Sequence, residues 1–169
     1  MASERQEEVL AVARELLARD GVEGLTVGRL AGALGIRPPS LYKHFASKRE
    51  VEAALIAEGL EAHADTVEAA GDGLAAIAAA YRRFALDHAQ LYRLMTERPL
   101  PREHLPAGLE ARAAAPLLRA LGGDADLARA AWAFVHGMVQ LELAGRFPPD
   151  AELPAAWRRG VEALEAAAA

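Results

Sequence analysis

Between Pro39 and His44 the sequence places a cation, a hydroxyl, a phenol and an imidazole within six residues, and no acid among them. These groups belong to Lys43, Ser40, Tyr42 and His44. On a helix with 100° per residue, Pro39 and Lys43 point the same way, Ser40 and Tyr42 flank them, and His44 lies on the shoulder. Such groups suit hydrogen bonds to phosphates and to base edges in the major groove. The segment therefore predicts a surface that reads DNA.

The charge around this segment is unevenly distributed. The whole chain has a formal net charge of −5, which by itself argues against a polyanionic partner. Residues 24–49 nevertheless carry five cations and no acid, whereas residues 50–169 carry 18 acids against 11 arginines. The five cations are Arg29, Arg37, Lys43, Lys48 and Arg49. Because the distribution of charge matters more than its sum, the basic stretch favours a nucleic-acid partner. An accidental solvated face is the alternative that charge alone leaves open.

Two short helices joined by a tight turn would present such a surface. Thr26 is a favoured N-cap residue for the first helix, and Gly35 tolerates the positive φ that the turn requires. Leu41 and Phe45 are four residues apart, so they share one face of the second helix and point back into a core. The spacing predicts a helix-turn-helix within residues 24–50.

The start of the second helix adds a further expectation. Pro39 disfavours helical geometry at Pro38, so Pro39 is expected to be the first helical residue. Neither Arg37 nor Pro38 has a side chain that caps a helix. The N–H groups of Ser40 and Leu41 would then be left for a DNA phosphate, or else for water or the hydroxyl of Ser40.

The elements that must position these groups are expected to be helices throughout. Alanine, leucine, glutamate and arginine dominate the chain, and all four are strong helix formers. Ser3 with Gln6 and Ser47 with Glu50 each predict a capping box at the start of a helix. With apolar periodicity, these signals predict helices over about 4–20, 26–34, 39–45, 48–70, 74–97 with a break before Leu91, 107–121 kinked or split at Pro116, 124–147 and 153–168. We expect an all-α fold of about nine helices. Its first domain, residues 1–48, is an N-terminal three-helix helix-turn-helix domain, and residues 49–169 form a C-terminal helical bundle for effector binding and dimerisation.

The helix near the C-terminus predicts a dimer. From Ala130 to Leu141 the chain has no charged residue, so this helix must be covered on all sides. A partner subunit could cover one side and the protomer core the other, with the last helix completing a four-helix bundle. The predicted interface residues are Ala131, Phe134, Val135, Val139, Trp157, Val161 and Leu164. The alternative is the central helix of a monomer.

Aromatic and sulfur-containing side chains behind the first domain are candidates to line a cavity for a small-molecule effector. They are Tyr81, Phe84, Tyr92, Met95, Trp132, His136 and Met138. Residues of these types are more often part of an ordinary core than ligand contacts. His136 follows Trp132 by four residues, so the two share a face, and the imidazole would serve either an effector or a backbone carbonyl.

Several other classes are disfavoured. The chain has no phosphate-cradling glycine loop, no His-Glu-x-x-His motif and no nucleophile elbow, which argues against an enzyme. Cysteine is absent, and the histidines lack paired helical spacing, so neither a metal nor a cofactor is expected. A protein-interaction module that no longer meets DNA is the other alternative. No apolar run would span a bilayer and no leader opens the chain, so we expect a cytoplasmic protein without a membrane partner.

The first 50 residues resemble the DNA-binding domain of the TetR family of one-component regulators. The resemblance is carried by Leu25-Thr26, Leu30-Ala31, Leu34-Gly35-Ile36, Leu41-Tyr42-Lys43-His44-Phe45 and Ser47-Lys48. It implies that Thr26 contacts a phosphate, that Lys48 anchors the DNA backbone, and that the groove is lined by Arg37, Pro39, Ser40, Tyr42, Lys43 and His44. Gly28 departs from the family pattern, where a polar or charged residue is common. One DNA contact is then either missing or supplied by Arg29.

A second, shorter resemblance lies in the stretch from Trp132 to Phe147. Trp132, His136 and Gly137 are similar to a tryptophan–histidine–glycine signature in one branch of TetR C-terminal domains. The two resemblances together imply a homodimer on a pseudo-palindromic double-stranded DNA operator, released by a small-molecule effector. Repression is expected because a dimer on a promoter blocks polymerase. Activation stays open.

Overall fold

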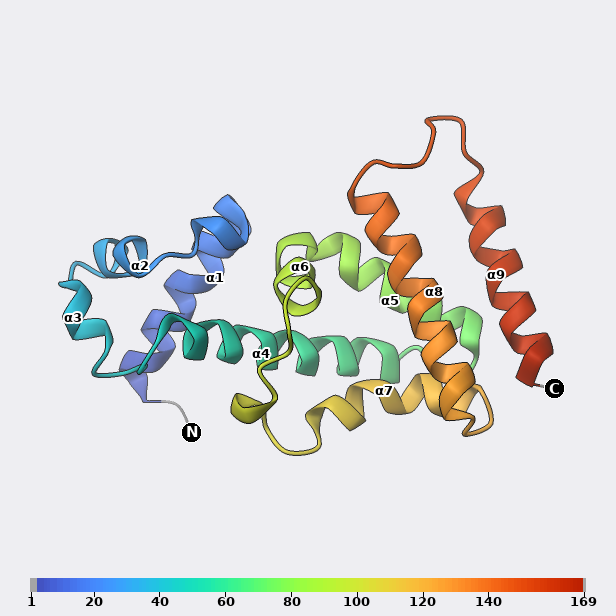
Figure 1. Cartoon of the computed structure of the whole chain (residues 1–169), viewed down its shortest axis with the longest axis horizontal. Coiled ribbons are helices and arrows are strands. Elements are labelled where there is room, and N and C mark those ends of the chain that lie inside the picture. The colour runs from blue at the N-terminus through green and yellow to red at the C-terminus, as the bar shows by residue number, and fades with distance from the viewer. Residues whose placement is uncertain (1–2, 169) are drawn as a thin grey trace. The chain divides into compact units, whose positions relative to one another are not determined.

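Helices form most of the described chain, residues 3–168, in this computed structural model (Figure 1). The α-helices are α1 (Glu4–Gly24), α2 (Val27–Ala33), α3 (Pro38–Leu41), α4 (Lys48–Glu68), α5 (Leu74–Asp87), α6 (Ala89–Thr96), α7 (Leu109–Ala120), α8 (Ala125–Leu143) and α9 (Leu153–Ala168). A 3-10 turn, Arg102–His104, lies between α6 and α7. The all-α fold and the number of helices expected from the sequence are confirmed over these residues.

The chain divides into two compact units. The first contains the described residues up to Leu60 together with His88–Leu109, and the second contains Glu61–Asp87 and the chain from Glu110 onward. Helix α4 contributes to both units. The domain boundary expected after residue 48 lies at the start of α4, whereas the two compact units divide within α4, after Leu60. The expected boundary stays a prediction.

The first helix begins with the capping box that the sequence predicts. Ser3 Oγ accepts from the Gln6 N–H at 3.2 Å, and Gln6 Oε1 accepts from the Ser3 N–H at 2.9 Å. The Gln6 amide also donates through Nε2 to the His44 carbonyl at 3.0 Å. The start of α1 therefore holds the turn that follows α3. Helical geometry is interrupted at Gly21, with φ 68°, where the sequence predicts the end of the helix.

Apolar side chains on three short segments build the core beneath the exposed face of α3. Leu30 and Ala31 of α2 and Leu41 of α3 are buried, as is Phe45 just after α3. The α1 side chains that join this core are Val9, Leu10, Ala13, Leu16 and Leu17. Burying a large apolar side chain contributes about 1.5–3 kcal/mol, so this small core is sufficient to fix the orientation of α3.

Close packing at Gly59 joins α4 to α6 within the first unit. A Cβ at Gly59 would lie 2.7 Å from Met95 Sδ and 3.2 Å from Leu91 Cδ1. Only glycine lets α6 approach α4 this closely without moving those side chains.

In the second unit, α8 packs on both α5 and α9, and Figure 1 shows α8 and α9 running antiparallel. The rings of Phe134 and Trp157 meet edge to face with centroids 5.7 Å apart. A Cβ at Gly160 would lie 2.0 Å from Phe134 Cζ, so the contact between these two helices depends on a glycine.

Several local expectations need correction. Helix α3 ends at Leu41 rather than Phe45, and α5 and α6 separate at His88 rather than before Leu91. Helix α3 begins at Pro38 rather than Pro39, because proline has no N–H to lose in the first turn and Arg37 takes the extended geometry, φ −81° and ψ 144°, that precedes a proline. Helix α8 ends at Leu143, with Gly145 at φ 60°, short of the expected end at Phe147. Helix α7 continues through Pro116 without being split.

Across the described chain, no helix is both long and apolar enough to cross a membrane.

Candidate nucleic-acid interface

Helices α2 and α3, with the turn between them, form a helix-turn-helix. Thr26 caps α2, since its Oγ1 accepts from the Arg29 N–H at 3.3 Å. Gly35 has φ 65° in the turn, a conformation that glycine adopts without steric cost. Ile36 then donates from its N–H to the Ala31 carbonyl at 2.9 Å. The turn chemistry inferred from the sequence is confirmed.

The side chains of α3 and the turn after it separate into a buried and an exposed set. Leu41 and Phe45 are buried, as their spacing predicts. Arg37, Pro39 and Lys43 are exposed, Tyr42 is 51% exposed, and Ser40 and His44 are half-buried. The orientation of this face agrees with the helical wheel. Contact of these residues with DNA stays a prediction.

The expectation that the Ser40 N–H is left without a partner is wrong. This group donates to the Arg37 carbonyl at 2.8 Å. Because α3 starts one residue earlier than expected, Ser40 already lies inside the first turn and closes it. Arg37 has no side-chain capping bond, in agreement with the sequence.

Three of the five cations in residues 24–49 are paired with acids of the protein. Arg29 pairs with Asp20, Lys48 with Glu52 and Arg49 with Glu103, at 2.5, 3.0 and 2.7 Å. Hydrogen bonds from Arg19 above all, together with Arg29, hold the pKa of Asp20 below its ordinary value. Arg37 and Lys43 have no ion-pair partner within residues 3–168. The unpaired positive charge of the stretch is thus concentrated at α3 and the turn that follows it.

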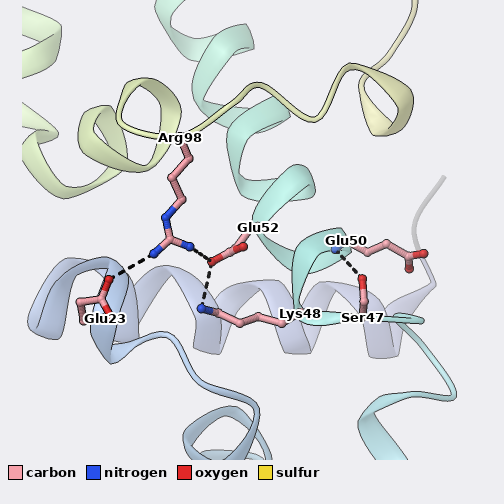
Figure 2. A network of polar contacts seen from close by, with 6 residues as sticks. All are labelled: Glu23, Ser47, Lys48, Glu50, Glu52 and Arg98. Atoms are coloured by element: carbon pink, nitrogen blue, oxygen red, sulfur yellow. Dashed lines mark hydrogen bonds and ion pairs between the residues drawn. The ribbon is translucent and has the colours of Figure 1, made fainter.

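A network of charged side chains surrounds the start of α4 (Figure 2). Lys48 Nζ lies 3.0 Å from Glu52 Oε1, and Arg98 Nη1 lies 3.3 Å from the same oxygen. The other arm of Arg98 reaches Glu23 at 3.1 Å. Lys48, expected at the DNA backbone, is therefore paired within the protein here.

Ser47 caps α4 as expected, because its Oγ accepts from the Glu50 N–H at 3.2 Å. The Glu50 carboxylate returns a hydrogen bond one residue earlier than a capping box requires, to the Ala46 N–H at 2.7 Å.

Gly28 faces open space on α2. A Cβ at this position would have no heavy atom within 4 Å, so the structure leaves room for the polar side chain that the family pattern carries there. Arg29, the suggested replacement, is committed to Asp20.

The seven residues expected to line an effector cavity are divided between the two units. Tyr92 and Met95 are buried in the first unit, and Tyr81 and Phe84 are buried in the second. His136 and Met138 are half-buried, and burial lowers the pKa of His136. Trp132 is 52% exposed, so it does not belong to a core. The structure brings together only part of this set.

His63 on α4 is a residue that sequence reasoning used only in rejecting a metal site. It is 8% exposed, and its ring meets Tyr81 and Phe84 edge to face, with centroids 4.9 and 5.2 Å apart. Its Nε2 is buried without a hydrogen-bond partner among the described residues. Burial lowers the pKa of His63 to about 4, so the ring is neutral at pH 7. Its spacing from apolar Ile56 and Val67 was the available signal that it faces a core.

The residues expected at the dimer interface lie mostly inside one protomer. Ala131, Val135, Val139, Trp157 and Val161 are buried, while Phe134 and Leu164 are half-buried. The uncharged stretch of α8 also has an outward face, formed by Trp132, Ala133, His136 and Gln140. We call this set the outer face of α8. The rings of Trp132 and His136 lie side by side on it, tilted by 32° with centroids 5.9 Å apart.

No group of three or more His, Asp or Glu side chains placed to hold a metal ion occurs among residues 3–168. The helix-turn-helix with its exposed basic face places the chain in the class of helix-turn-helix DNA-binding regulators.

Comparison with known proteins identifies the family. The model described as "Bacterial regulatory proteins, tetR family" matches residues 9–55, and the model "Tetracyclin repressor-like, C-terminal domain" matches residues 74–164. An uncharacterised HTH-type transcriptional regulator of Mycobacterium tuberculosis is 31% identical over 154 residues, which cover 83% of this chain and 71% of that protein. The chain belongs to the TetR family of DNA-binding transcriptional regulators, which are not enzymes.

Solved structures have the same fold. The regulatory protein SCO4313 superposes with a TM-score of 0.76 and 25% identity, over 97% of this chain and 98% of that one. A TetR variant from Acinetobacter baumannii, solved in complex with minocycline, has a TM-score of 0.66 and 25% identity over 94% and 93% of the two chains. Four tetracycline repressor proteins are also similar, but the matched segments cover only 23% to 37% of their lengths.

Proposed function

We propose that the protein is a dimeric repressor that binds a pseudo-palindromic operator and leaves it when a small molecule binds the second unit. The proposal rests on two exposed and unpaired cations, Arg37 directly before α3 and Lys43 in the turn after it. Cations that the protein does not neutralise are free to release counterions from DNA phosphates.

The residues proposed to contact DNA differ in whether they already have an acidic partner in the protein. Exposed or half-buried groups without an acidic partner can meet DNA directly: Thr26, Arg37, Pro39, Ser40, Tyr42, Lys43 and His44. Arg29 and Lys48 must first leave Asp20 and Glu52. We assign backbone contacts to Thr26 and to the two paired cations, and groove contacts to the other six residues of the first group.

A second copy of the chain is the proposed cover for the outer face of α8, with α9 adding contacts through half-buried Leu164. Trp132 is the anchor, because an exposed tryptophan on an uncharged surface is typical of an interface centre. Trp132→Glu is expected to give monomers in sedimentation velocity, whereas Leu86→Glu, at a leucine that is 38% exposed on α5, is expected to leave the dimer intact. Equal sedimentation of both variants and wild type would rule out this interface.

The effector site is proposed around His63, Tyr81 and Phe84. A buried polar atom normally has a partner, so the unpartnered Nε2 favours a ligand that hydrogen-bonds to it. The two aromatic rings favour an uncharged, largely apolar body. Beside a neutral imidazole, an uncharged ligand of this class is favoured over an organic cation. Membership of the tryptophan–histidine–glycine branch, through Trp132, His136 and Gly137, is part of the same proposal.

Selection of DNA from a random pool tests the proposed function. The expected result is a pseudo-palindrome with half-sites one helical turn apart, about 10 base pairs, or a multiple of it. Uncharged aromatic compounds are then screened for release of the selected DNA, and His63→Phe is expected to lose the response while keeping DNA affinity. A pool with no enriched sequence would overturn the proposal. The regulator would act where the DNA is, in the cytoplasm.

A further inference from the structure

We propose that Arg98 is a positioning residue for DNA binding: it keeps Glu52 paired when Lys48 leaves that carboxylate for a DNA phosphate. The proposal rests on the proposed function, because Lys48 has a phosphate to reach only if the chain binds DNA.

The geometry around Glu52 is unusual because one oxygen serves two cations. Lys48 and Arg98 both pair with Oε1, at 3.0 and 3.3 Å (Figure 2). The Glu52 side chain is only 14% exposed, whereas those of Lys48 and Arg98 are more exposed. The carboxylate therefore depends on its protein partners more than either cation depends on it.

Losing one of two partners has a different cost from losing the only one. A carboxylate with little access to water is strongly destabilised when its last cation is removed. Lys48 carries its ammonium on a flexible stem with three donors, so it can turn toward a phosphate. With Arg98 in place, Glu52 stays paired during that movement, and Lys48 is free to change partner.

The second arm of Arg98 holds the guanidinium in position. It pairs with Glu23 near the end of α1, and that carboxylate is almost fully exposed. An exposed pair contributes little free energy, so Glu23 orients Arg98 without determining the charge balance at Glu52. Figure 2 shows Arg98, from the segment after α6, reaching between α1 and α4.

Two simpler roles for Arg98 must be separated from this one. Arg98 could be a clamp for the first unit, or a distant positive charge that attracts DNA. Two double variants with equal net charge make the separation. Arg98→Met with Glu52→Gln removes the carboxylate that would hold Lys48, whereas Arg98→Met with Glu23→Gln leaves it.

The experiment measures operator affinity over a range of salt concentrations for wild type, Arg98→Met and the two double variants, with thermal unfolding of each. Arg98→Met is expected to weaken binding about tenfold, and to make the plot of log K against log salt shallower by about 0.9 per protomer, as for one lost phosphate contact. The double variant with Glu52→Gln is expected to recover wild-type affinity and slope. The double variant with Glu23→Gln is expected to behave like Arg98→Met.

Equal recovery by both double variants would show that Arg98 acts only through net charge. If neither double variant recovers operator affinity and both unfold at lower temperature than wild type, Arg98 acts as a structural clamp for the first unit. Either result overturns the proposal. Arg112→Met is a matched control, because Arg112 also bridges two carboxylates, Asp65 and Glu68, within the second unit, and its loss should leave the salt slope unchanged. If wild type itself selects no DNA, it is the proposed function that fails.

Discussion

The guanidinium of Arg82 on α5 holds the carboxylate of Glu142 on α8 through two nitrogens: Nε donates to both carboxylate oxygens at 3.0 Å, and Nη2 donates to Oε2 at 2.7 Å. Trp157 of α9 donates from Nε1 to the same carboxylate at 2.6 Å. The Glu142 side chain is 9% exposed, so this carboxylate joins three helices in a place with little water.

The first prediction concerns this junction. Glu142→Leu leaves both Arg82 and the Trp157 indole N–H without their acceptor. We expect the free energy of unfolding to fall by about 1–3 kcal/mol, less than the roughly 3–5 kcal/mol for a fully buried pair, because the Arg82 side chain is partly exposed. Urea denaturation measures it. Glu162→Leu, which removes only the exposed contact to Arg158, is the control and should change stability by less than about 0.5 kcal/mol.

Stability is expected to depend on pH through His63. Its pKa is about 4 in the folded chain against an ordinary value of 6.5, so the unfolded chain binds more protons between these values. Stability from this group is complete above pH 6.5 and declines as the pH falls toward 4. Between pH 7.5 and 5 the loss is about 2 kcal/mol by linkage.

The comparison of wild type with His63→Phe isolates this contribution, because other titrating groups are common to both proteins. Urea denaturation at pH 7.5 and pH 5 should show a smaller loss in His63→Phe. Identical losses in the two proteins would mean that His63 is not held neutral by burial.

Two glycine substitutions should act in opposite directions. Gly28→Ala adds a methyl group that meets nothing on the exposed side of α2, and glycine costs a helix about 0.5–1 kcal/mol relative to alanine. Its thermal midpoint should rise. Gly160→Ala should lower the midpoint, because the new Cβ would lie 2.0 Å from Phe134 Cζ. The prediction fails if both midpoints move the same way.

The sequence predicted the helix-turn-helix well because its signals are local. The caps at Ser3, Thr26 and Ser47 and the turn at Gly35 each act within a few residues, and all four are present. The inward orientation of α3 and the turn after it follows from the spacing of Leu41 and Phe45 alone.

Partners distant in the sequence were the main source of error. Three of the five cations look free in the sequence because their acids lie outside residues 24–49; Glu103, for example, lies 54 residues beyond Arg49. The uncharged run of α8 predicted that the helix is covered, but not which side the protomer itself covers. Five of the expected interface residues are therefore core, and Trp132, expected in a cavity, is exposed.

The central claim is that the two unpaired cations, Arg37 and Lys43, bind DNA phosphates or bases. The most direct test is operator affinity as a function of salt for wild type and Lys43→Ala. Lys43 is exposed and without an ion-pair partner in residues 3–168, so the thermal midpoint of Lys43→Ala should equal that of wild type. Affinity should fall about tenfold, and the salt slope should become shallower by about 0.9 per protomer if Lys43 binds a phosphate. A flat salt response of the wild type, or equally weak binding of every DNA sequence by both proteins, would contradict the account.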